Sequence, residues 1–106
     1  MIDFGVAYDK LAQFETSDEI AEFLKFEGVK AKVGDTRSCA ISVWMKNITG
    51  LGIRTNFSSV RAVDETQMIG SRNIEGLERS LTVVLRTFVS KFDNGWYPEL
   101  LQEDYR

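Results

Sequence analysis

The chain lacks histidine altogether and has a single cysteine, Cys39, among its 106 residues. The absence of histidine excludes Ser-His-Asp and Cys-His catalysis, histidine general bases, and zinc sites that combine Cys with His. One cysteine cannot form an intramolecular disulfide, which is typical of proteins kept in a reducing compartment. From these absences we expect a cytoplasmic protein that is not an enzyme and carries no cofactor.

Proline and long apolar runs are scarce as well. A single proline, Pro98, and the lack of any low-complexity tract argue against disorder. No apolar run approaches the roughly 18 residues of a membrane span, and the first residues lack the basic and apolar segments of a signal peptide. With 43% hydrophobic and 27% charged residues, the composition predicts one globular domain over residues 1–106 that makes no membrane contact.

Charge is distributed unevenly along the chain. Residues 1–27 have a net charge of −5, residues 28–92 of +5 and residues 93–106 of −3, which gives −3 overall. Two interpretations stay open. Either the acidic ends pair with the basic middle on folding, or the charges form an ordinary mixed, solvated surface.

Hydrophobic spacing and end signals predict an α+β fold. Helices are expected over residues 4–14, 17–27 and 38–48, with a long helix over 74–92, packed on a small antiparallel hairpin over 52–64. The second helix has the clearest start, because Thr16 and Glu19 have the spacing of a capping box and Gly28 follows as a stop. The first and third segments also alternate like strands, so their helical assignment is a choice between two periodicities.

The long helix is predicted from one continuous apolar stripe at helical spacing. The stripe consists of Ile74, Leu77, Leu81, Val84, Leu85, Phe88, Val89 and Phe92. Glu75 and Arg79 would form an i, i+4 ion pair on this helix, and Asn94-Gly95 is a typical left-handed stop. The apolar segment that follows, residues 96–101, is expected to fold back onto the body, with Trp96 buried.

Candidate catalytic chemistry is weak throughout the chain. Cys39 near a helix start could be an activated nucleophile, but we prefer a small buried side chain, because unpaired cysteines are usually buried and inert. The carboxylates lack the spacing of a calcium loop and are predicted to be solvated. Gly50-Leu51-Gly52 lacks the Gly-Lys-Ser/Thr that completes a phosphate loop. No catalytic residue or metal ligand is therefore predicted.

Two surfaces are candidates for binding a partner. The tail could contact a host protein if its aromatic side chains are exposed, because aromatic residues dominate interface hot spots. The outward face of the hairpin could contact nucleic-acid phosphates through arginine. The candidate residues are Trp96, Tyr97, Glu99, Glu103 and Asp104 for the protein contact, and Arg37, Arg54 and Arg61 for the nucleic acid.

Four segments stand out in the sequence, namely residues 18–24 (DEIAEFL), 27–30 (EGVK), 39–44 (CAISVW) and 88–98 (FVSKFDNGWYP). They resemble short uncharacterised proteins carried by phages and actinobacteria. The resemblance covers most of the chain. It implies a phage or actinobacterial setting for the protein, and it implies no activity.

A second comparison concerns residues 47–54 (NITGLGIR) and 88–96 (FVSKFDNGW). They are similar to two stretches of a family of small Cas9-inhibiting anti-CRISPR proteins. That family mimics DNA with a strongly acidic surface, whereas the middle of this chain is basic, so no binding residue is carried over.

Together these features predict a non-enzymatic, phage-type interaction protein that binds and modulates a host protein, for example as a defence-system inhibitor. The alternative is a nucleic-acid-binding module that uses the basic hairpin face. The two differ in salt dependence, because phosphate contacts weaken steeply as salt rises. The oligomeric state stays open.

Overall fold

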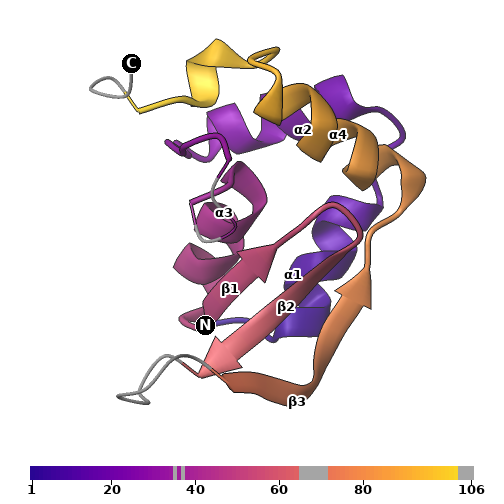
Figure 1. Ribbon diagram of the computed structural model, residues 1–106, viewed down its shortest axis with the longest axis vertical. Helices are drawn as coiled ribbons and strands as arrows, with labels where there is room; N and C mark the ends of the chain where they lie inside the picture. Colours follow the sequence, from indigo (N-terminus) through magenta and orange to yellow (C-terminus); the bar gives the residue numbers. More distant parts are fainter. Residues whose placement is uncertain (35, 37, 65–71, 103–106) are drawn as a thin grey trace.

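The computed structural model describes residues 1–34, 36, 38–64 and 72–102 of the chain. Within these residues, four α-helices and a three-stranded antiparallel sheet form an α+β fold, as predicted (Figure 1). The elements are α1 (Phe4–Ala12), α2 (Ser17–Phe26), α3 (Ala40–Thr49), β1 (Gly52–Thr55), β2 (Ser59–Asp64), β3 (Arg72–Ser80), α4 (Val83–Asp93) and the 3-10 turn η1 (Pro98–Leu100). None of the described helices is both long and apolar enough to cross a membrane.

Local sequence signals set the ends of α2 and α3. The predicted capping box of α2 is present: the Glu19 amide donates to Thr16 Oγ1 at 3.1 Å, and the Thr16 amide donates to Glu19 Oε1 at 3.0 Å. Gly50 ends α3 with a φ of 76°, a left-handed conformation that glycine adopts at little cost. Helix α3 begins two residues later than predicted, and its N-cap is Cys39, whose side chain makes no capping hydrogen bond.

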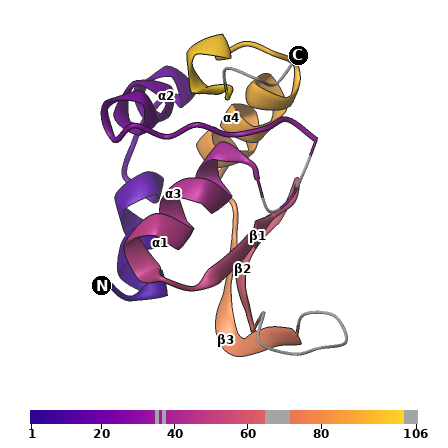
Figure 2. The same ribbon diagram turned by 90° about the vertical axis from the view of Figure 1, so that its left-hand side faces the viewer.

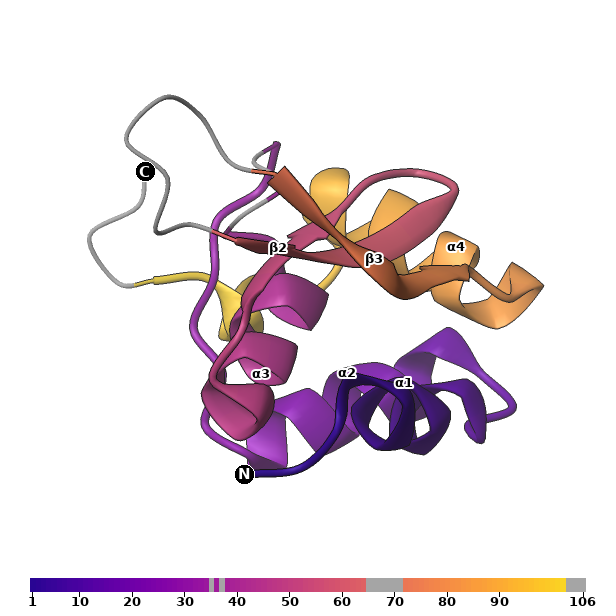
Figure 3. The same cartoon turned by 90° about the horizontal axis from the view of Figure 1, so that it is seen from below.

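The sheet has the strand order β1-β2-β3, and the predicted hairpin supplies its first two strands. Their register pairs Ile53 with Ala62, and both side chains are buried. Asn56 fixes the turn between the strands, because its Oδ1 accepts hydrogen bonds from the amides of Ser58 and Ser59, each at 2.8 Å. Helices α1 and α3 lie on one side of the sheet (Figures 2 and 3).

The prediction of one long helix over 74–92 is wrong in its first half. Residues 72–80 form strand β3, and α4 begins only at Val83. The pairing of β3 with β2 shifts register partway along the strand, and Gly76 within it has a φ of 82°. An irregularity of this kind breaks the two-residue alternation of a strand, so Ile74 and Leu77 imitate helical spacing.

Helix α4 begins at a local signal that the apolar stripe hides. Thr82 is the N-cap, and its Oγ1 accepts a hydrogen bond from the Leu85 amide at 3.1 Å. Glu75 and Arg79, predicted as a helical ion pair, lie in β3 instead. The Arg79 guanidinium lies over the Phe4 ring of α1, 5.6 Å from its centroid, and so ties the strand to the helix.

The core lies between the helices and the inner face of the sheet. Phe88 and Phe92 are buried, as predicted, and Phe88 stacks on Phe92 and Tyr97 with centroid separations of 6.1 and 5.3 Å. The C-terminal segment folds back as expected: Leu100 is fully buried, and its carbonyl accepts a hydrogen bond from the Ala31 amide at 2.7 Å. This closure brings the tail beside α2.

Candidate functional site

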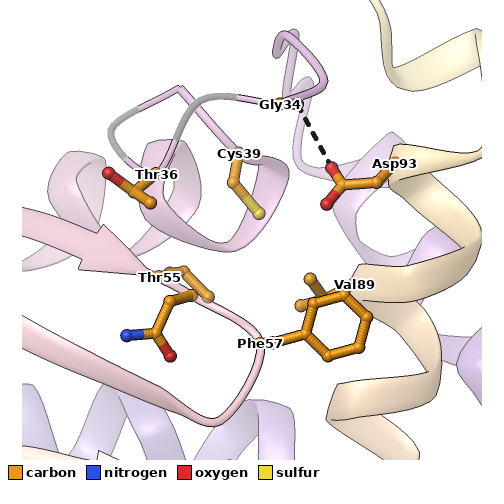
Figure 4. Close-up of a pocket in the computed structure, with 8 residues that line it drawn as sticks. Gly34, Thr36, Cys39, Thr55, Phe57, Val89 and Asp93 are labelled. Carbon is orange, nitrogen blue, oxygen red and sulfur yellow. Dashed lines mark hydrogen bonds between the residues drawn. The ribbon is translucent and has the colours of Figure 1, made fainter.

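A small cavity surrounds Cys39, between the start of α3, the β1–β2 turn and the end of α4 (Figure 4). Its volume is about 200 Å³, and Thr36, Thr55 and Asp93 contribute its polar lining. The Asp93 carboxylate accepts a hydrogen bond from the Gly34 amide at 3.3 Å. The cavity therefore has a mixed lining, because Phe57 and Val89 also contribute to it, and any chemistry in it would depend on the state of the thiol.

The Cys39 thiol stays protonated at neutral pH. It is 4% exposed, and burial raises its pKa to about 11, although backbone N–H groups at the start of α3 act in the opposite direction. Because the thiolate is the reactive form, such a cysteine is a weak nucleophile. The interpretation of Cys39 as a small buried side chain is confirmed.

The acidic residues of the first helices are solvated, as predicted, and two of them have structural partners. Asp18, Glu19 and Glu22 are exposed along α2. Asp18 Oδ1 accepts a hydrogen bond from the Tyr97 hydroxyl at 2.8 Å, and Glu19 belongs to the capping box. Across the part of the chain that the structure describes, no group of three His, Cys, Asp or Glu side chains could hold a metal ion.

The two aromatic residues after α4 have opposite environments. Trp96, predicted to be buried, is 65% exposed, whereas Tyr97 is 6% exposed. The reason is the end of α4: the Gly95 amide donates to the Phe92 carbonyl and the Trp96 amide to the Lys91 carbonyl, both at 3.0 Å. This is the Schellman arrangement, which places the residue after the glycine against the last turn of the helix, here beside Lys91.

The rest of the predicted tail site divides into residues that hold the tail and residues that the structure leaves undescribed. Burial raises the pKa of the Tyr97 hydroxyl, which lies 3.1 Å from Ser17 Oγ as well as donating to Asp18. Glu99 is half-buried, and its carbonyl accepts a hydrogen bond from Lys30 Nζ at 3.0 Å. Glu103 and Asp104 lie outside the described residues. Among the described candidate residues of the tail, Trp96 is the one whose side chain is largely exposed.

Trp96 belongs to a larger exposed surface along α4, which we call the α4 face. Phe57, Val83 and Trp96 are 63%, 68% and 65% exposed. Lys91 Nζ lies 5.1 Å from the centroid of the Trp96 ring, within the range of a cation–π contact. Besides Trp96, the α4 face consists of Phe57, Val83, Arg86, Thr87, Ser90 and Lys91, which line a groove of about 550 Å³.

The α4 face combines large apolar side chains with positive charge. Apolar side chains gathered on an exposed surface mark sites of interaction, and Trp and Arg are among the residue types that dominate interface hot spots. Sequence reasoning named Trp96 as a candidate but gave no role to Phe57, which lies in the turn beyond the end of β1 at Thr55. Val83 gave no signal, because the predicted helix did not start there.

Arg54 and Arg61 are direct cross-strand neighbours on the outward face of the hairpin, as predicted. Both are half-buried, and the Nε atom of Arg61 is buried without a hydrogen-bond partner among the described residues. The same row continues into β3, where Glu78 lies opposite Arg61. Arg37, the third predicted phosphate contact, lies outside the described residues. The carboxylate of Glu78 reduces the attraction of this row of side chains for phosphate.

Comparison of the chain with protein-family models, with curated proteins and with solved structures found no match.

Proposed function

We propose that this chain is a non-enzymatic, phage-type interaction protein that binds and modulates a host protein through the α4 face. The observation that carries the proposal is the exposure of Trp96, in contact with Lys91, on the same surface as the exposed Phe57 and Val83. The protonated, buried Cys39 thiol supports a role without catalysis. Inhibition of a defence system is one form of this function, supported by the similarity of residues 88–96 to the Cas9-inhibiting family.

The charge of the α4 face defines the chemistry of the partner. Arg86 and Lys91 flank the apolar side chains, so the complementary surface has Asp or Glu around an apolar pocket. Trp96 would fill this pocket. Truncation of a buried interface tryptophan costs at least about 2 kcal/mol, so Trp96→Ala should weaken binding roughly 30-fold or more.

The first experiment is capture from bacterial lysate with tagged protein, followed by mass spectrometry at low and moderate salt. The test variant is Phe57→Ser with Trp96→Ala. The matched control is Val6→Ser on α1, which removes an apolar side chain that is 48% exposed outside the α4 face. We expect wild type and control to retain the same dominant protein at moderate salt and the α4-face variant to lose it. Equal capture by all three would contradict the proposal, and Cas9 as the captured protein would support the anti-CRISPR form.

A nucleic-acid-binding module is the second candidate, and the cross-strand pair of Arg54 and Arg61 is the observation in its favour. This function predicts a mobility shift with DNA or RNA at low salt that disappears as salt rises. Arg61→Gln should reduce the shift, whereas Trp96→Ala should leave it unchanged. If no nucleic acid shifts the protein at low salt, this candidate is excluded.

A further inference from the structure

A second apolar groove, of opposite charge, lies on the outer side of α2, and we call it the α2 face. Its volume is about 560 Å³. Phe26 is 87% exposed. Phe14 and Phe23 line the same groove, and the centroids of their two rings are 5.2 Å apart. The α2 face consists of Phe14, Asp18, Glu19, Glu22, Phe23 and Phe26. Three phenylalanines and three carboxylates therefore share one surface.

The arrangement of these side chains favours a basic, apolar partner. Asp18, Glu22 and Phe26 follow one another at intervals of four residues, so they form one stripe along the helix. Asp18 and Glu19 already accept hydrogen bonds within the chain, whereas Glu22 has no such partner among the described residues. An apolar surface of this kind with excess negative charge is complementary to apolar side chains flanked by Lys or Arg.

The α4 face of the same chain has this complementary composition. Its exposed Val83, Phe57 and Trp96 are apolar, and Arg86 and Lys91 supply positive charge beside them. The charge that each groove needs in a partner is thus present on the other.

The two faces cannot meet within one chain. Helices α2 and α4 pack against each other through their buried sides, and Figures 1 and 2 show them side by side. Ile20 and Leu24 of α2 and Phe88 and Phe92 of α4 are buried, so the outer faces of the two helices point away from each other. A second copy of the chain can bring its basic, apolar α4 face to the α2 groove.

We propose that the chain self-associates head to tail, with the α2 face of one copy on the α4 face of the next. The contact is heterologous, because the two copies use different surfaces, and it leaves one face of each type open at the ends. This inference rests on the α4 face as a docking surface, as the proposed function does. Self-association would then compete with the host partner for the α4 face.

The test is light scattering coupled to size-exclusion chromatography, at protein concentrations up to about 1 mM, the range of weak association. One variant disables the α2 face (Glu22→Arg with Phe26→Ala), and the other disables the α4 face (Arg86→Glu with Trp96→Ala). All four side chains are exposed, and circular dichroism verifies folding. If either variant fails to fold, the single substitutions Glu22→Gln and Arg86→Gln replace them.

We expect wild type to exceed the monomer mass of 12.1 kDa as concentration rises, and to do so less at high salt. Each variant alone should be monomeric. A mixture of the two should form a 1:1 dimer and nothing larger, because one intact α4 face meets one intact α2 face. Wild type that stays monomeric, variants that still associate alone, or a mixture that stays monomeric beside an associating wild type would each overturn the inference.

The host-partner assay separates this inference from the proposed function. The α2-face variant should capture the host protein at least as well as wild type, because its α4 face is intact. The α4-face variant should lose both activities. Host capture without self-association would overturn only the inference, whereas self-association without host capture would overturn only the proposed function.

Discussion

Trp96 and Tyr97 are neighbours in the sequence, yet Trp96 is exposed and Tyr97 is buried, and the turn at Gly95 precedes both. Gly95 has a φ of 81°, and the hydrogen bonds on either side of it turn Trp96 toward solvent and Tyr97 toward the core. A residue with a Cβ is strained in this conformation, so glycine is favoured at this position. The side chains then settle these positions, because Tyr97 stacks on Phe88 and donates to Asp18, whereas Trp96 lies against Lys91.

Truncation of the buried Phe88 ring should cost far more folding stability than truncation of the exposed Trp96 ring. Phe88 is fully buried and stacks on two other rings, so Phe88→Ala should lower the free energy of unfolding by about 3–5 kcal/mol. Trp96→Ala, at 65% exposure, should change it by less than about 1 kcal/mol. Urea unfolding followed by circular dichroism measures both values. Similar losses in the two variants would place Trp96 in the core.

Cys39 should make the stability of the protein fall at alkaline pH. Burial raises the pKa of the thiol from 9.0 to about 11, so the folded state holds the proton more tightly than the unfolded state. The stabilising contribution is complete below pH 9 and is lost as the pH rises through 11. Two pKa units correspond to about 3 kcal/mol.

The matched control is Cys39→Ala, which retains Tyr8 and Tyr97, whose pKa values are also raised by burial. Wild type should lose stability more steeply than this variant between pH 8.5 and 11, and parallel curves would refute the assignment. In native protein at neutral pH, iodoacetamide should modify Cys39 far more slowly than a free peptide thiol.

At the scale of the element, prediction succeeded for α2, whose ends have clear local signals, and failed for β3, whose conformation depends on pairing with another strand. Helix α2 was predictable because the signals for both of its ends lie next to it in the sequence. They are Thr16 and Glu19 at the start and Gly28 after the end. Strand β3 was not, because its conformation depends on hydrogen bonds to β2 and its register shift spaces apolar residues like a helix. The signals that could have corrected the prediction are Gly76 inside the supposed helix and Thr82 as a cap.

Gly76→Ala distinguishes the observed strand from the predicted helix. In a helix this substitution would stabilise the protein by about 0.5–1 kcal/mol, because alanine is the better helix former. In β3 the φ of Gly76 is 82° and nothing lies within 4 Å of an added Cβ, so backbone strain alone acts. We expect a loss of about 1–2 kcal/mol in urea unfolding. A gain in stability would contradict the strand and support the predicted helix at this position.

At the scale of the whole molecule, the C-terminal segment closes the fold and also supplies part of the candidate site. The Ala31 amide and carbonyl pair with the Leu100 carbonyl and the Gln102 amide, and Tyr97 reaches α2. The sequence predicted this return from the apolar composition of the tail. It could not predict the α4 face, because which apolar side chains remain uncovered depends on how the helices and the hairpin pack together.

Removal of residues 96–106 should therefore abolish folding as well as partner binding. The deletion removes two buried anchors, Tyr97 and Leu100, and truncation of each large buried side chain costs about 2–5 kcal/mol. Their sum is comparable with the whole stability of a domain, typically about 5–15 kcal/mol. Circular dichroism should show no cooperative thermal transition for the deletion variant, whereas Trp96→Ala should retain one near the wild-type temperature. A folded deletion variant would mean that the tail is dispensable to the core, and that its whole contribution lies in the surface that Trp96 presents.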